Sequence, residues 1–299
     1  MLGNQIDATA FLKKAYEEYL QIFSSGDLES ELPYLSYEFD FIHDRDVDIF
    51  GKMMIEDDLR EITNILNEWC HLLHRWYAWN KVLDFYKEDE QKEWELESEF
   101  LGLIIDKCLF VPSRIKDTFI NVGIENFHQI RLAFDKNYKD EIRGYDPILP
   151  KLEPIYLNRR KKEKILRKVL HFCDYNDFFC KLMSLNDRHY QKKLTKDYRN
   201  LSSHGIAPRI TAGIVSPVIR TIIKTTKIEE NADGSYSEVE VKGKTSIAYS
   251  FGGKQPLDRN ILFNTNLEEF KKAISCYKEF KSLLIETSPS QILCNCPLD

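Results

Sequence analysis

The sequence predicts a mainly α-helical protein, an antiparallel helical bundle that carries a β-hairpin near its C-terminus. Apolar residues recur three or four positions apart over most of the first 205 residues, which is the spacing of amphipathic helices. The 12 Gly and 10 Pro concentrate after residue 200, where runs of Ile, Val, Thr and Tyr replace the helical spacing. Hydrophobic residues make up 43% of the 299-residue chain, which is enough for a packed core.

The predicted elements divide the chain into four segments. Residues 1–55 form an N-terminal arm, with a helix over 7–23 followed by an irregular stretch. Residues 56–205 form the bundle. Residues 206–262 form the hairpin insertion, and residues 263–299 form a C-terminal helix and tail that pack on the bundle.

Within the bundle, the apolar spacing predicts five helices, over residues 56–86, 95–110, 112–134, 158–173 and 177–203. We expect a break before Pro112, because the missing N–H of a proline costs nothing in the first turn of a helix. The last of these helices carries Tyr190, Leu194, Tyr198 and Leu201 on one face.

The hairpin is predicted from two β-rich runs, residues 214–227 and 236–250. The sequence Asn231-Ala232-Asp233-Gly234 lies between them and is typical of a hairpin turn. Helical spacing returns over residues 267–285, which predicts the C-terminal helix.

Composition favours a soluble, cytoplasmic protein. No stretch approaches the roughly 18 apolar residues that a membrane span requires, and residues 1–14 lack the apolar core of a signal peptide. The seven cysteines are odd in number and scattered, so we expect reduced thiols rather than disulfides. Cys294 and Cys296 have no second pair to complete a zinc site.

A metal-dependent hydrolase is one alternative function. Its residues are His43, Asp44, Asp46, His71 and His74. The acidic stretch lacks the Gly and Glu of a helix-loop-helix calcium loop, since Ile49 and Ile55 stand at those positions. The histidine pair lacks a third ligand in register. We therefore expect no metal and no cofactor, with a solvated acidic loop and a packed or hydrogen-bonded histidine pair.

Positive charge is concentrated in one segment of an acidic chain. Residues 155–200 contain thirteen Lys and Arg against five Asp and Glu, a local net charge of +8 in a chain whose total is −6. This asymmetry is typical of a local phosphate-binding face, although a run of charges is also compatible with a merely solvated helix.

At the end of this basic segment, Arg199 is followed by four residues and then His204, with Asn200 directly after the arginine. This Arg-x4-His pattern, near the end of a late helix in a helix-rich region, resembles the HEPN superfamily. The resemblance implies a homodimer with one composite cleft and metal-independent cleavage of RNA. In that reaction the 2′-hydroxyl attacks phosphorus, His204 exchanges protons and Arg199 neutralises charge on the phosphoryl oxygens.

Helix geometry limits how these residues meet. Arg199 and His204 are five residues and about 140° apart on one straight helix, whereas Asn200 and His204 are one turn apart. A site that uses both the arginine and the histidine therefore requires an early helix end or a second copy of the chain. Gly205 is a natural helix terminator, which places His204 in the last turn, where the helix dipole stabilises imidazolium.

The leading hypothesis is a homodimeric endoribonuclease, with RNA as substrate and an antitoxin or other regulatory protein as a candidate partner. The residues expected to contact RNA are Arg159, Arg160, Lys161, Lys162, Lys192, Lys193 and Lys196. Two alternatives stay open. The chain is a non-catalytic module that binds RNA, a nucleotide or a protein, or Arg199 pairs with an acidic neighbour and His204 contacts the last helix carbonyls.

Overall fold

The computed structural model describes residues 2–29, 31–148, 152–211, 213–215 and 218–288. This part of the chain is mainly helical and carries a two-stranded antiparallel hairpin near the C-terminus, which confirms the coarse fold prediction. The chain divides into two compact units, Met1–Leu194 together with Asn260–Asp299, and Thr195–Arg259.

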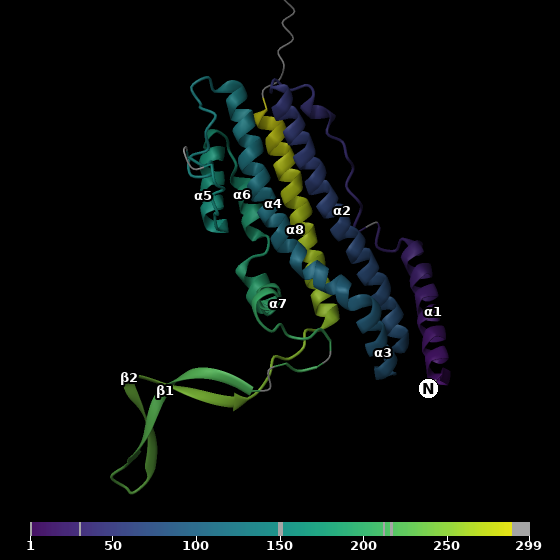
Figure 1. The fold of residues 1–299 in the computed structure, drawn as a ribbon, viewed down its shortest axis with the longest axis vertical. Coiled ribbons are helices and arrows are strands. Elements are labelled where there is room, and N and C mark those ends of the chain that lie inside the picture. Colours follow the sequence, from purple (N-terminus) through teal and green to yellow (C-terminus); the bar gives the residue numbers. More distant parts are fainter. Residues whose placement is uncertain (1, 30, 149–151, 212, 216–217, 289–299) are drawn as a thin grey trace, which may run out of the picture. The chain divides into compact units, whose positions relative to one another are not determined.

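Three long helices form the centre of the first unit: α2 (Ile49–Tyr86), α4 (Gly102–Phe134) and α8 (Arg259–Thr287). They run side by side along most of their length (Figure 1). Arg114 of α4 pairs with Glu61 of α2, while Lys107 pairs with Glu68, so the two helices are antiparallel.

Aromatic contacts hold α8 against both other helices. Phe270 meets Trp69 of α2 edge-on, with ring centres 5.3 Å apart. Phe280 lies between Phe119 and Phe127 of α4, with ring centres 5.9 and 5.6 Å away. All five side chains are almost completely buried, and burial of one such ring stabilises the fold by about 1.5–3 kcal/mol.

The N-terminal helix α1 (Leu2–Ser25) packs on α2 near α3 (Glu90–Leu96) and the π-helical segment after it (Glu97–Leu101). Trp79 of α2 connects them, because Tyr19 stacks on its indole at 4.6 Å and Phe100 stacks on it at 4.4 Å. This stack anchors α1 on α2.

Two shorter helices, α5 (Arg159–Val169) and α6 (Asn176–Ser184), lie beside α4. Gly123 of α4 allows the close approach of α5, since a Cβ there would lie 3.0 Å from Leu166 Cδ1. Lys116 of α4 is buried, and its Nζ donates to the Leu185 carbonyl at 2.9 Å, which satisfies a backbone acceptor just past the end of α6.

The predicted continuous helix over 177–203 is wrong. The chain leaves α6 after Ser184, forms a π-helical segment at Tyr190–Leu194 and then begins α7 (Tyr198–His204). Asn186, Lys196 and Asp197 adopt positive φ values of 45°, 48° and 61°, which no α-helix accommodates. The apolar spacing of this region therefore spans three separate pieces.

Other helix boundaries also differ from prediction. The predicted helix over 95–110 is divided among α3, the π-helical segment and the start of α4, and α8 begins at Arg259 rather than near residue 267. The expected break before Pro112 is wrong, because α4 continues through it. Pro112 is itself buried, and packing of the residues on both sides outweighs the loss of one backbone hydrogen bond. Helix α2 begins at Ile49 rather than near residue 56, because Asp48 caps it: its Oδ1 accepts from Gly51 N at 2.8 Å.

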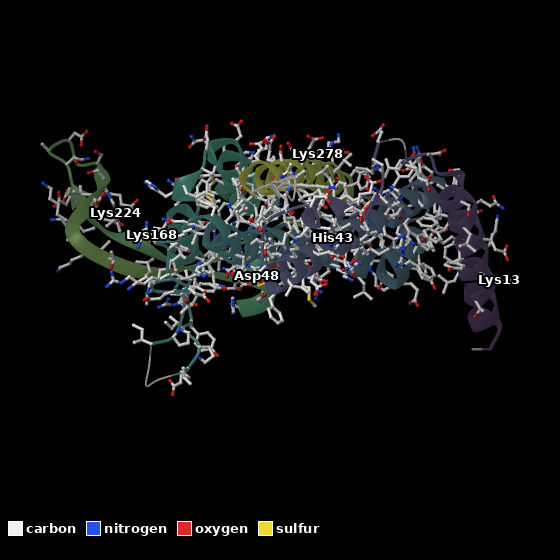
Figure 2. All side chains as sticks on the ribbon, turned by 90° about the horizontal axis from the view of Figure 1, so that it is seen from above. Lys13, His43, Asp48, Lys168, Lys224 and Lys278 are labelled. Atoms are coloured by element: carbon white, nitrogen blue, oxygen red, sulfur yellow. The ribbon has the colours of Figure 1, made fainter. Side chains whose placement is uncertain are left out.

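In the second unit, β1 (Val218–Glu230) and β2 (Tyr236–Phe251) form the predicted hairpin. Its turn places Gly234 at φ 81°, and Asn231 N donates to Ser235 O at 2.7 Å. The strands shift register between Lys224 and Thr226. Lys224, labelled in Figure 2, pairs across the strands with Glu240 at 2.8 Å.

No helix in the described ranges combines the length and the apolar character that crossing a membrane requires. The cysteines that the structure describes are free thiols: Cys70, Cys108, Cys173, Cys180 and Cys276. Burial raises the pKa of the Cys70 thiol to about 12, so this thiol stays protonated at neutral pH. Cys294 and Cys296 lie outside the described residues.

Candidate nucleic-acid interface

The Arg-x4-His motif lies on α7, in the second unit. Arg199, Asn200 and His204 are all exposed, whereas Tyr198 is 8% exposed and anchors the helix. The helix is unbroken from Tyr198 to His204 and ends where Gly205 N donates to Leu201 O at 2.9 Å. Arg199 and His204 therefore share a helix but not a face, about 140° apart around its axis.

The side chains of the motif have few internal contacts. Asn200 Nδ2 donates to Asp197 Oδ2 at 3.4 Å, so its amide turns toward the start of α7 rather than toward His204. Within the described ranges, the side chains of Arg199 and His204 make no hydrogen bond or ion pair. Among the described residues, Arg199 therefore has no acidic partner and the His204 imidazole contacts no helix carbonyl, although the alternative interpretation expects both contacts.

The basic segment forms one face of α5, in the first unit. Asn158 caps the helix, since its Oδ1 accepts from Lys161 N at 3.0 Å. At about 100° per residue, five exposed cations fall within about 120° of the helix circumference. We call this set the α5 basic face: Arg160, Lys161, Lys164, Arg167 and Lys168. The opposite side of α5 is apolar and buried.

Several residues expected to contact RNA already have protein partners. Arg159 makes a two-point ion pair with Asp117, with both N···O distances at 2.6 Å, and also donates to Ser113 Oγ. Lys162 Nζ donates to Asn121 Oδ1 at 2.9 Å. These contacts hold the start of α5 against α4, so Arg159 and Lys162 stabilise the packing of these two helices.

The other predicted residues are exposed. Arg160 and Lys161 belong to the α5 basic face, and Lys192 and Lys193 lie on the π-helical segment at Tyr190–Leu194. Lys196 donates to the carbonyls of residues 255 and 256, each at 3.4 Å, inside the second unit. The residues predicted to contact RNA do not include Lys164, Arg167 and Lys168. A helical wheel nevertheless places these three cations on the same face as Arg160 and Lys161.

The residues of the metal hypothesis are separated or already engaged. His74 is buried, and its Nε2 donates to the Leu32 carbonyl at 3.0 Å, while His71 Nδ1 lies 3.2 Å from the Tyr34 hydroxyl. Burial lowers the pKa of both imidazoles. His43 lies 3.8 Å from Glu56, and among the residues with described positions no group of three His, Cys, Asp or Glu is placed to hold a metal.

Comparison with protein-family models, with curated proteins and with solved structures finds no match to this chain. The function must therefore be inferred from its own residues. Two features are available for that purpose: the exposed Arg199 and His204 of α7, and the α5 basic face.

Proposed function

We propose that this chain is an HEPN-like, metal-independent endoribonuclease that cuts RNA in a cleft built from two copies of the chain. The observation that carries the proposal is the state of α7. It presents an arginine and a histidine in the Arg-x4-His pattern, both exposed and both without a partner among the described residues. Groups that act on a ligand must be accessible to it, and both of these side chains meet that condition.

The chemistry of these two side chains suits cleavage of a phosphodiester. The guanidinium of Arg199 keeps its charge at any physiological pH and presents several donors to phosphoryl oxygens. An imidazole side chain is able to accept and donate a proton in general acid–base catalysis, and His204 is exposed at the end of α7. Attack by the 2′-hydroxyl then yields a 2′,3′-cyclic phosphate and a 5′-hydroxyl, and the reaction uses no metal.

Geometry is the reason for a second copy. Because Arg199 and His204 lie about 140° apart on an unbroken helix, one α7 does not direct both side chains to the same phosphate. In a two-fold dimer, Arg199 of one protomer meets His204 of the other. The α5 basic face contributes contacts to the RNA backbone that are independent of base sequence.

The test is cleavage of single-stranded RNA by the purified protein in the presence of EDTA. We expect products with 2′,3′-cyclic phosphate ends. Arg199→Ala and His204→Ala should each lower the rate at least about 100-fold, since each removes stabilisation from the transition state. Ser203→Ala, which changes another exposed residue of α7, is the matched control and should retain activity.

Mixing the two inactive variants tests the composite cleft directly. In a dimer of one Arg199→Ala copy and one His204→Ala copy, one of the two sites keeps an intact arginine and an intact histidine. Activity should therefore return on mixing. Intact RNA with the wild-type dimer, confirmed folded by circular dichroism, would overturn the proposal, and failure of the mixture to regain activity would overturn the composite cleft.

A second candidate function is binding of RNA without turnover. It is favoured by the Asn200 amide, which is bonded to Asp197 instead of orienting His204, and by the α5 basic face, which needs no catalyst. Replacing Arg160, Lys164 and Lys168 together by Ala should lower the salt dependence of binding by a slope of about 2, at about 0.7 for each phosphate contact with a single strand. Salt-sensitive binding without cleavage would select this function.

A further inference from the structure

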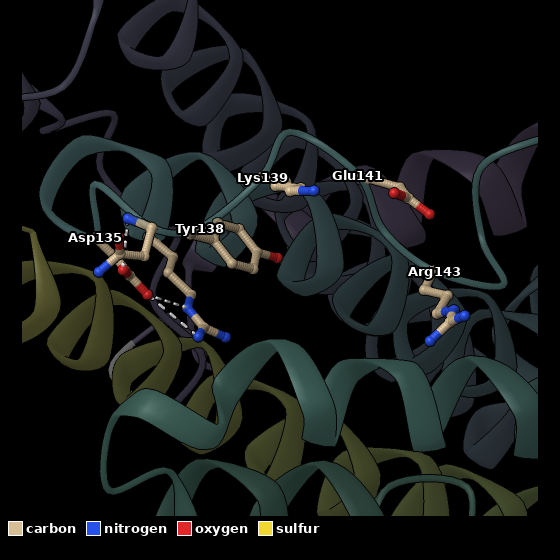
Figure 3. Close-up of a pocket in the computed structure, with 7 residues that line it drawn as sticks. Asp135, Tyr138, Lys139, Glu141 and Arg143 are labelled. Carbon is tan, nitrogen blue, oxygen red and sulfur yellow. Dashed lines mark hydrogen bonds and ion pairs between the residues drawn. The ribbon is translucent and has the colours of Figure 1, made fainter.

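A cavity of about 440 Å³ lies at the C-terminal end of α4, outside both features of the proposed function. Figure 3 shows residues that line it, from Asp135 and Tyr138 at one end, past Lys139, to Glu141 and Arg143 at the other. A smaller hollow of about 190 Å³ shares several of these residues and extends to α5, where Ile165, Lys168 and Val169 line it. The volume falls in the range of pockets that hold small molecules.

One wall of the cavity is held rigidly. The imidazole of His128, which is 4% exposed, bridges two neighbours: Nδ1 lies 2.8 Å from the Tyr138 hydroxyl and Nε2 lies 2.9 Å from Asp140 Oδ1. The guanidinium of Arg131 lies 4.2 Å from the centre of the Tyr138 ring, and Asp135 holds it through two contacts at 3.3 Å. These contacts hold Arg131 and Tyr138 against each other on this wall.

The lining residues that do not pair with one another carry a net positive charge. Asp135 already pairs with Arg131. Three further cations, Lys139, Arg143 and Lys168, are exposed and have no acidic partner within the part of the chain that the structure describes. Glu141 is the single acidic group that opposes them among the lining residues of the two hollows. This excess favours an anion.

The inner hollow adds apolar surface. Ile142, Ile165 and Val169 are buried and border it together with Arg131 and Tyr138. Apolar wall on one side and cations at the rim do not suit a bare inorganic ion, which gains nothing from the apolar part. They suit a molecule that joins a flat ring to a phosphate group.

We propose that this cavity binds a small organic phosphomonoester with a flat ring, about the size of a nucleoside monophosphate. The ring lies against the Arg131–Tyr138 pair and the apolar hollow. The phosphate meets Arg143 at the rim, with Lys139 and Lys168 near it. The inference does not rest on the endoribonuclease proposal, because it uses no residue of α7 and shares only Lys168 with the α5 basic face.

Titration calorimetry of the full chain with AMP, uridine monophosphate, adenosine and inorganic phosphate tests the inference. We expect at least one monophosphate to bind at least about tenfold more tightly than adenosine or inorganic phosphate. Arg143→Ala and Lys139→Ala should each weaken that binding about tenfold or more, which is the usual effect of losing one charged hydrogen bond. Lys278→Ala, an exposed lysine of α8 labelled in Figure 2, should bind like wild type.

Two results would overturn the inference. The first is a folded protein that binds neither monophosphate, or that binds adenosine as well as AMP. The second comes from a comparison of two trinucleotide RNAs, one with a 5′-phosphate and one with a 5′-hydroxyl end, which tests whether the bound phosphate belongs to an RNA end. If the phosphorylated RNA binds through Arg143 while both monophosphates do not, the cavity is an RNA-end site and the small-ligand inference is wrong. Loss of RNA cleavage in the α7 variants leaves this outcome unchanged, so the two proposals fail separately.

Discussion

Asp58 of α2 is a carboxyl group whose surroundings oppose its charge. Its Oδ2 is buried without a hydrogen-bond partner in the described chain. Glu125 of α4 is close enough to repel it, and the Glu125 carboxylate accepts a hydrogen bond from the Tyr145 hydroxyl at 2.8 Å. Burial, with smaller contributions from Glu125 and Asp57, raises the pKa of Asp58 to about 7.

This raised pKa makes stability depend on pH. Between about pH 4 and pH 7, the unfolded chain ionises Asp58 while the native state keeps it protonated, so the native state binds more protons. Its free energy of unfolding therefore falls as pH rises through this window. Asp58→Asn removes the ionisation and should stabilise the protein relative to wild type by about 2 kcal/mol more at pH 8 than at pH 4, after allowance for partial solvent exposure.

Urea unfolding of wild type and Asp58→Asn at pH 4 and pH 8 measures this difference. Asp57→Asn is the matched control, because Asp57 is the exposed neighbour on the same helix and should show no comparable change between the two pH values. An Asp58→Asn effect of equal size at both pH values would contradict the assignment.

At the scale of residues, the sequence predicts the direction in which a side chain leaves its helix, but not its partner on a distant segment. The helical wheel separates Arg199 from His204, and α7 has that geometry. The wheel gives no means to foresee that Arg159 would bind Asp117, because the two lie 42 residues apart and meet only when α5 packs on α4. Membership of a basic run is therefore weak evidence that a given cation is available to RNA.

At the scale of elements, the start of α2 shows how one acidic residue is used. The acidic stretch before it contains Asp44, Asp46 and Asp48, and Asp48 is the N-cap of the helix. Asp48→Ala should lower the free energy of unfolding by about 1 kcal/mol, the usual cost of losing a side-chain cap. Thermal or urea unfolding checks this value.

Asp46→Ala is the control for the Asp48 experiment, since Asp46 is exposed and precedes the cap by two residues. It should change stability by a few tenths of a kcal/mol at most. If calcium stabilised the wild type and Asp46→Ala abolished that effect, the metal interpretation of this stretch would replace the capping one.

The spacing of apolar residues predicts a helix or strand well where that element packs on its apolar face. It does not reveal residues with positive φ, which interrupt an element. The long helices and the hairpin agree with their apolar spacing and turn residues. Spacing over 177–203 was compatible with one helix, yet positive φ values at Asn186 and Asp197 divide it. Asn and Asp tolerate that conformation better than most residues, so their presence is compatible with a break in the helix. Both residue types are too common to predict such a break on their own.

At the scale of the whole molecule, the first unit has its own core. Trp69, Phe119, Phe270 and Phe280 are all within it and almost completely buried. A chain in which a flexible Gly/Ser linker replaces residues 195–259 should therefore keep a folded bundle. Circular dichroism should show the helical signal of the first unit, without the contribution of α7, and thermal unfolding should stay cooperative.

The same deletion variant separates the two proposals of function. It lacks Arg199 and His204, so it should have no RNA cleavage, while the cavity lined by Tyr138 and Arg143 should still bind a monophosphate. A broad, non-cooperative melting curve would contradict the independence of the first unit. The sequence predicts the inserted hairpin, but it does not reveal which helices complete the core around it, because that depends on contacts between distant segments.

The place of α8 in this core also determines when the protein is able to fold during its synthesis. Helices α2 and α4 leave the ribosome early, but the helix that covers their aromatic side chains ends at Thr287, long after Phe134. At about 5–20 residues per second, a ribosome needs roughly 8–30 s for that interval. Throughout it Trp69 and Phe119 lack their α8 partners, so the nascent chain presents an apolar surface that chaperones recognise.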